Sequence, residues 1–177
     1  MHPQRWVERA KSLRVDPVDD QTVRFLATLV DHSEGPEGPE VVHSLRLEGT
    51  ISLPDLTIRS VAAQALQQPY RECAASVEPL AQLVGLRIGR GFTQRVLELL
   101  GGVRGCSHFL ALVLDLAGSH TLATYLQLRD RVPLASSDRD DSDWTRVALE
   151  IEPRLENACI GLKAELRPMQ NARRKRD

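Results

Sequence analysis

The sequence predicts an α+β fold in which a three-stranded antiparallel meander packs against a helical layer. Before Tyr70, apolar and polar residues alternate with a period of two over three segments, as in strands that bury one face. Short stretches rich in turn-forming residues join these segments, which favours antiparallel pairing between neighbours. Beyond Tyr70 the apolar residues recur at helical spacing, so helices are expected to cover the sheet.

An N-terminal arm precedes the predicted strands. The arm, residues 1–20, is expected to be short and weakly helical, because Trp6 and Val7 stand among charged residues. The strands are expected over residues 22–29, 41–52 and 56–65.

The segment between the first two strands, residues 32–40, is rich in Gly, Pro and Glu and is expected to be a flexible surface loop. In the second strand the alternation of apolar and polar residues places His43 on the inward face. His43 is therefore a candidate for a polar group that fixes a ligand between sheet and helices.

Five segments have helical spacing. The third of them is apolar almost all round, which requires burial on several sides, so it is expected to be the central helix. The fifth is expected to begin at Pro153 and to bury Leu155, Ala158, Cys159, Leu162 and Leu166. The five segments are 76–84 with Ser76 as cap, 92–100, 109–116, 121–128, and the helix from Pro153. Residues 21–167 are expected to form a single α+β domain, with an acidic loop at 135–143 and a basic disordered tail at 168–177.

The charge and composition exclude some classes of partner. The chain has 177 residues, with 23 Lys and Arg against 24 Asp and Glu, which gives a net charge of −1. No global positive field is available to attract nucleic acid or an anionic membrane. No uninterrupted apolar run approaches the roughly 20 residues that span a bilayer. Three cysteines, an odd number, favour a reducing compartment, so we expect a cytoplasmic protein. The sequence leaves open whether the chain forms a homo-oligomer or binds a partner enzyme.

Several short motifs resemble a known bacterial family, the domain of unknown function 2889. They are Gly85-Leu86-Arg87-Ile88-Gly89, Gly91-Phe92-Thr93, the run from Leu99 to His108, Pro69-Tyr70-Arg71 leading to Cys73, and Cys159 followed by Gly161-Leu162. The resemblance covers roughly His43 to Leu162. It implies an apolar small-molecule ligand of the acyl-thioester, steroid or polyketide-like kind.

The same resemblance singles out the cysteines, since all three lie where the family pattern has cysteine. His108 follows two residues after Cys106. Typical members carry Cys-His near the last cysteine, whereas here Ile160 follows Cys159, so a role that needs that histidine is not carried over.

A Cys/His site is the sharpest chemical prediction. Cys106 stands just before a predicted helix that Ser107 could cap, where unpaired amides and the helix dipole favour a thiolate. In one interpretation Cys106 is a nucleophile and His108 carries protons, while His43, Tyr70 and Arg87 contact the ligand. The chain is then a small-molecule enzyme or binder.

A second interpretation gives the same residues to a metal. Thiolates of Cys73, Cys106 and Cys159, with an imidazole of His108 or His43, are ligand types that suit zinc or iron. Three meandering strands followed by a cysteine also resemble iron–sulfur cluster scaffold proteins, although the middle cysteine of those proteins is missing here. The chain would then be a metal- or sulfur-handling protein.

A purely structural role for these residues is the alternative to both interpretations. Free cysteine is among the most frequently buried residues, and a cysteine at i cannot share a helical face with a histidine at i+2. The two could meet only at the start of the helix. Arg87, Arg90 and Arg95 suit either an anionic ligand group or a solvated face. A non-catalytic subunit that docks on a partner enzyme is the third functional hypothesis.

Overall fold

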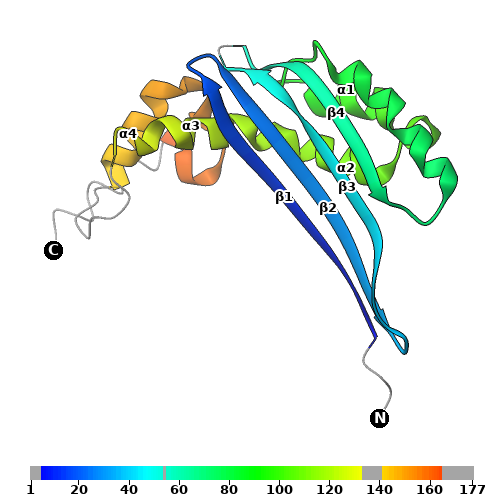
Figure 1. The fold of residues 1–177 in the computed structure, drawn as a ribbon. Coiled ribbons are helices and arrows are strands. Elements are labelled where there is room, and N and C mark those ends of the chain that lie inside the picture. Colours follow the sequence, from blue (N-terminus) through cyan, green and yellow to red (C-terminus); the bar gives the residue numbers. More distant parts are fainter. Residues whose placement is uncertain (1–4, 54, 133–140, 165–177) are drawn as a thin grey trace. The chain divides into compact units, whose positions relative to one another are not determined.

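The computed structural model describes residues 5–53, 55–132 and 141–164 (Figure 1). The chain divides into two compact units, Met1–His120 and Thr121–Asp177. The first unit contains a sheet and the helices that cover it, which confirms the α+β class. The second unit is helical over its described residues.

The sheet has four antiparallel strands in sequence order rather than the three expected. They are β1 (Trp6–Asp19), β2 (Thr22–Gly35), β3 (Gly38–Ser52) and β4 (Thr57–Gln67). The extra strand is β1, so the prediction of a weakly helical arm was wrong. Only Val15 of β1 is buried, because an edge strand needs few apolar residues, and the sequence therefore shows no period-two signal there.

The segment 32–40, expected to be a flexible loop, belongs mostly to the β2–β3 hairpin. Only Pro36 and Glu37 lie between the strands, and Gly38 adopts a positive φ of 102° that favours glycine. Asp31 pairs with His43 while His32 pairs with Val41, so Val42 is an extra residue that forms a β-bulge. The prediction missed the strand ends because this part of the hairpin is polar and half-exposed.

The core of the first unit lies between one face of the sheet and the segments packed on it, namely α2 (Ser107–Asp115) and the 3-10 turn Glu78–Leu83. The helix α1 (Phe92–Leu100) packs on both of these. The expected helix at 92–100 is confirmed, and α2 is the expected central helix. It packs on β2 and β3 and, with Leu116 at its end, buries apolar side chains (Figure 1). These side chains are Phe109, Leu112, Val113 and Leu116.

The expected helix at 76–84 is instead a pair of 3-10 turns, Arg71–Ser76 and Glu78–Leu83. Leu80 and Leu83 are buried as expected, but Val84 is exposed. Ser76 does not cap a helix, because its hydroxyl donates to the carbonyl oxygen of Cys73 at 2.6 Å. This bond closes the first turn.

The second unit contains most of α3 (Ser119–Arg129) and all of α4 (Asp141–Ile151). Leu128, Val147 and Ala148 form its core, with Trp144 packed against them. The helix expected from Pro153 is wrong: Pro153–Leu155 and Ile160–Leu162 are short 3-10 turns, and Asn157 has a positive φ. Among the described residues of its expected buried face, Leu155 is the one that is buried, whereas Ala158 and Cys159 are exposed.

Some predictions lie partly or wholly outside the described residues. These are most of the acidic loop at 135–143, Leu166 and the basic tail at 168–177.

The stretch Ser107–Arg129 is, by length and composition, apolar enough to cross a membrane. A buried helix of a core has the same composition, and α2 at the start of this stretch packs on the sheet.

Candidate functional site

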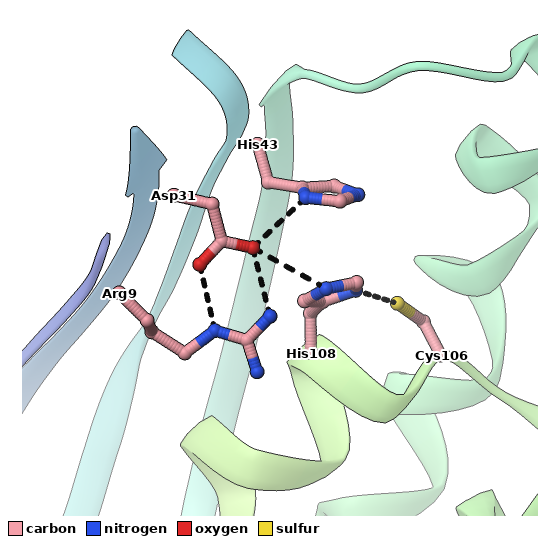
Figure 2. Close-up of polar contacts among 5 residues, drawn as sticks. All are labelled: Arg9, Asp31, His43, Cys106 and His108. Carbon is pink, nitrogen blue, oxygen red and sulfur yellow. Dashed lines mark hydrogen bonds and ion pairs between the residues drawn. The ribbon is translucent and has the colours of Figure 1, made fainter. Parts of the chain in front are cut away.

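Five polar side chains meet where the sheet faces the start of α2 (Figure 2). Arg9 comes from β1, Asp31 from β2, His43 from β3, and Cys106 and His108 from the N-terminal end of α2. We call these five residues the polar cluster. Arg9 is paired with Asp31 across β1 and β2, and Asp31 with His43 across β2 and β3. Cross-strand register therefore places three of the five in one row.

Asp31 is the centre of the polar cluster. The Arg9 guanidinium holds it with two bonds, Nε to Oδ1 at 2.6 Å and Nη2 to Oδ2 at 2.8 Å. The Nδ1 atom of His43 lies 2.9 Å from Oδ2. The Asp31 side chain is only 8% exposed, so a charge there needs these partners. The hydrogen bond from Arg9 holds the pKa of Asp31 below its ordinary value, although burial opposes this shift.

His108 links the carboxylate to the thiol. Its Nε2 lies 3.5 Å from Asp31 Oδ2, and its Nδ1 lies 3.3 Å from the Sγ of Cys106. The ring lies against that of His43, with 4.0 Å between centroids. Burial, and then the charges of His43 and Arg9, lower the pKa of His108, against the opposing effect of Asp31. A lowered pKa favours the neutral imidazole, which is the form that can accept a proton.

Local backbone geometry explains why Cys106 and His108 meet. Cys106 is the N-cap of α2 and is extended, with φ −110° and ψ 133°, while His108 lies in the first turn. Two residues separated in this way do not share a helical face, but the extended cap turns the sulfur back towards the ring. Ser107, expected as the cap, is the first residue of the helix instead. The preceding Gly105 is required, because a Cβ there would lie 2.6 Å from the carbonyl oxygen of Leu100.

A pocket of about 790 Å³ opens beside the polar cluster. His43, Cys106 and His108 line it together with Cys73, which follows β4 in the first 3-10 turn. The rest of the wall is largely apolar and includes Val42, Leu45, Pro69, Tyr70, Ala75 and Val103. A pocket of this size with a few convergent polar groups is typical of small-molecule sites.

The structure thus brings together most of the residues that the sequence selected. Cys106, His108 and His43 are in contact as a group, and Tyr70 and Cys73 line the same pocket. Arg87 does not line the pocket. This residue is exposed, and its backbone forms an isolated antiparallel β-bridge with Thr57. Cys159 lies in the second unit, exposed, ahead of a 3-10 turn.

Sequence reasoning missed Arg9 and Asp31. A signal for Asp31 was present, because it continues the inward-facing series of Val23, Phe25, Ala27 and Leu29 with an acid. A carboxylate at a core position needs a partner, and His43 on the next strand is that partner. Arg9 gave no comparable signal, since β1 was not recognised as a strand.

The polar cluster also offers ligands for a metal ion. One donor atom each from Asp31, His43 and His108 lie within 4.8 Å of one another. Among the described residues, this is the group whose donor atoms lie close enough together to hold one metal ion. It contains none of the cysteines.

Comparisons with known proteins bear on identity alone. No curated protein and no solved structure matches the chain. A protein family matches residues 7–121, which include all five members of the polar cluster and every strand of the sheet. The chain belongs to that family, described as "Protein of unknown function (DUF2889)".

Proposed function

We propose that this protein is an enzyme that cleaves or transfers the acyl group of an apolar ester or thioester through the thiol of Cys106. The observation that carries the proposal is the series of contacts from Cys106 Sγ to His108 Nδ1, and from His108 Nε2 to Asp31 Oδ2, beside a largely apolar pocket. Nucleophile, base and orienting carboxylate in this order are the components of a triad.

Each residue has a role that follows from its contacts. Cys106 is the nucleophile, because its sulfur faces both the pocket and an imidazole. His108 is the general base, and a proton on Nε2 directed at Asp31 leaves the Nδ1 lone pair facing the thiol. Asp31 orients that ring. Arg9 is a positioning residue, since its two bonds fix the carboxylate.

The reaction balances with water as the only co-reactant. Cys106 Sγ gives its proton to His108 and attacks the carbonyl carbon, so a carbon–sulfur bond forms. The alcohol or thiol of the substrate then leaves with that proton, and an acyl-enzyme remains. Water attacks the acyl carbon while His108 takes one of its protons. The bond to Cys106 then breaks, His108 returns that proton to the sulfur, and the carboxylic acid leaves.

The N-terminal end of α2 supports this chemistry. Backbone amides in the first turn of a helix have no acceptor within the helix, and the helix dipole places partial positive charge there. Cys106 is the cap of that turn. When its sulfur attacks a carbonyl carbon, the carbonyl oxygen becomes an oxyanion beside the free amides of Ser107 and His108.

The test is hydrolysis of a series of acyl thioesters with apolar chains of increasing length. We expect turnover with apolar chains, and an acyl adduct on Cys106 that mass spectrometry detects after rapid quenching. Cys106→Ser should abolish turnover with little change in Tm, and His108→Gln should lower kcat about 10²–10⁴-fold.

Cys159→Ala is the matched control, because this cysteine is exposed and lies in the other unit. It should keep the rate of the natural chain. Turnover that survives Cys106→Ser, or an adduct located on Cys73 instead, would contradict the assignment of the nucleophile.

A further inference from the structure

We propose that Asp31, His43 and His108 also form a binding site for a divalent transition-metal ion such as Zn²⁺, and that the bound ion prevents His108 from activating the thiol of Cys106. The blocking effect rests on the function proposed above, whereas the metal site stands on its own geometry. The set differs from the cysteine ligands that the sequence suggested, because the structure places a carboxylate and two imidazoles together instead.

The donors have the right chemistry and separation. Two imidazole nitrogens and one carboxylate oxygen are a ligand set that zinc and ferrous iron both accept. The three atoms lie within 4.8 Å of one another, so a single ion with bonds of about 2 Å can contact all three after small adjustments. They come from β2, β3 and α2, which are regular elements of one unit.

The surroundings favour a specific ion rather than loose surface binding. The side chains of His43 and His108 are 17% and 19% exposed, so most of each ring is withdrawn from water. Both histidines line the pocket, which leaves a path for an ion to enter and a side on which it can keep a water ligand. Arg9 holds the carboxylate from behind, as the partners of metal-bound carboxylates do.

Arg9 also limits the affinity. Asp31 and Arg9 together carry no net charge, so the two imidazoles must contribute much of the binding free energy. We therefore expect an ion that exchanges and that a chelator removes.

A bound ion would prevent the proton transfer that the triad needs. The Nε2 atom of His108 faces Asp31, so this is the nitrogen that the ion would take. A neutral imidazole has one proton and one free lone pair. With Nε2 on the metal, the proton must sit on Nδ1, which can then no longer accept the proton of Cys106. The ion and the base role of His108 exclude each other.

Binding is measured first, without reference to activity. The full chain is stripped with a chelator and titrated calorimetrically with ZnCl₂ alone. We expect one ion per chain, and a loss of affinity of at least about tenfold for His43→Gln and for Asp31→Asn, because each removes one of three ligands. Cys106→Ala should keep the affinity of the natural chain. Circular dichroism verifies that each variant is folded.

His32→Gln is the control for binding to any histidine, since His32 neighbours Asp31 in sequence but is not in the ligand set. Co²⁺ in place of Zn²⁺ should give the visible bands of nitrogen and oxygen ligation without a thiolate charge-transfer band. A thiolate band, or an affinity that falls in Cys106→Ala and persists in His43→Gln, would overturn the assigned set.

The second measurement separates the two proposals. In the thioester assay Zn²⁺ should inhibit the natural chain and a chelator should restore it, while His43→Gln should resist inhibition relative to its own metal-free rate. Equal inhibition of His43→Gln would show direct capture of the thiol and overturn the blocking role. Zinc binding to a chain that turns over no thioester would leave the metal site standing and remove the enzyme proposal.

Discussion

The Oδ2 atom of Asp31 faces three nitrogens from three elements: Nη2 of Arg9, Nδ1 of His43 and Nε2 of His108. A carboxylate oxygen has two lone pairs, so the three nitrogens must share these two acceptor positions. The other oxygen, Oδ1, accepts from Arg9 Nε alone among the bonds described. This single side chain therefore connects β1, β3 and α2.

Asp31→Asn should reduce the change in the free energy of unfolding with pH in the acidic range. The folded pKa of Asp31 is below its ordinary value of 3.8, because Arg9 donates to it. The stabilisation is therefore fully present above that ordinary value and is lost as pH falls through the folded pKa. We expect Asp31→Asn to cost about 1–3 kcal/mol near neutral pH.

Urea unfolding at successive pH values measures this difference. The groups facing Asp31 are Arg9, His43 and His108. The gap between the natural chain and Asp31→Asn should narrow as pH falls below the ordinary value of 3.8 and through the lower folded pKa. A gap that widens over this range would show that Asp31 is not stabilised as an anion.

Three of the five residues of the polar cluster could be predicted from the sequence. Cys106 and His108 were found because they are close along the chain, and His43 because alternation fixed its face. Asp31 and Arg9 depend on register, which sets the partner across two strand boundaries and cannot be read from either strand alone. The predicted thiol ligand Cys159 belongs to a segment whose helical spacing was misleading.

At the scale of elements, β3 is the strand on which the site depends, because it lies between β2 and β4 and carries His43. At Gly49, β3 passes close to groups of both neighbouring strands. A Cβ at this position would lie 1.9 Å from the carbonyl oxygen of Ser60 on β4 and 2.9 Å from the ring of Phe25 on β2. No side chain fits there without movement of the backbone.

Gly49→Ala should therefore destabilise the protein by several kcal/mol, since a fixed carbonyl and a core aromatic ring would both have to move. Chemical unfolding followed by circular dichroism measures the loss. Gly35→Ala is the matched control in the same hairpin, where an added Cβ meets no atom within 4 Å, and it should change stability little. Equal effects from the two substitutions would contradict this account of β3.

The elements with strong local signals were predicted correctly. β2, β3 and β4 alternate clearly, and α1 and α2 have apolar faces with glycine at their boundaries. β1 was missed because solvent covers most of it, so its sequence carries no burial pattern. The 3-10 turns at 71–83 bury leucines at spacing that an α-helix also produces, so periodicity alone could not separate the two.

On the scale of the whole molecule, the polar cluster is contained in one unit. All five of its residues and the described lining of the pocket belong to Met1–His120. The second unit has its own small core around Leu128, with Trp144 beside it and stacked near Tyr125 at 5.7 Å between ring centroids. The proposed chemistry therefore needs no side chain from the second unit.

Leu128→Ala should weaken the second unit while sparing the site. Leu128 is fully buried, and its loss is expected to cost that unit about 2–5 kcal/mol. The fluorescence of Trp144, in a Trp6→Phe background, reports unfolding of the second unit. The rate at which iodoacetamide alkylates Cys106 reports the site and should stay unchanged. A changed alkylation rate would show that the second unit supports the polar cluster.

The meander also determines when the site is completed during synthesis. Each strand pairs with the one made just before it, so Arg9, Asp31 and His43 can meet while the ribosome is still adding the following segments. Cys106 and His108 emerge much later and arrive together, on one helix. The row of Arg9, Asp31 and His43 can thus form first, and the nucleophile and its base join it together when α2 docks.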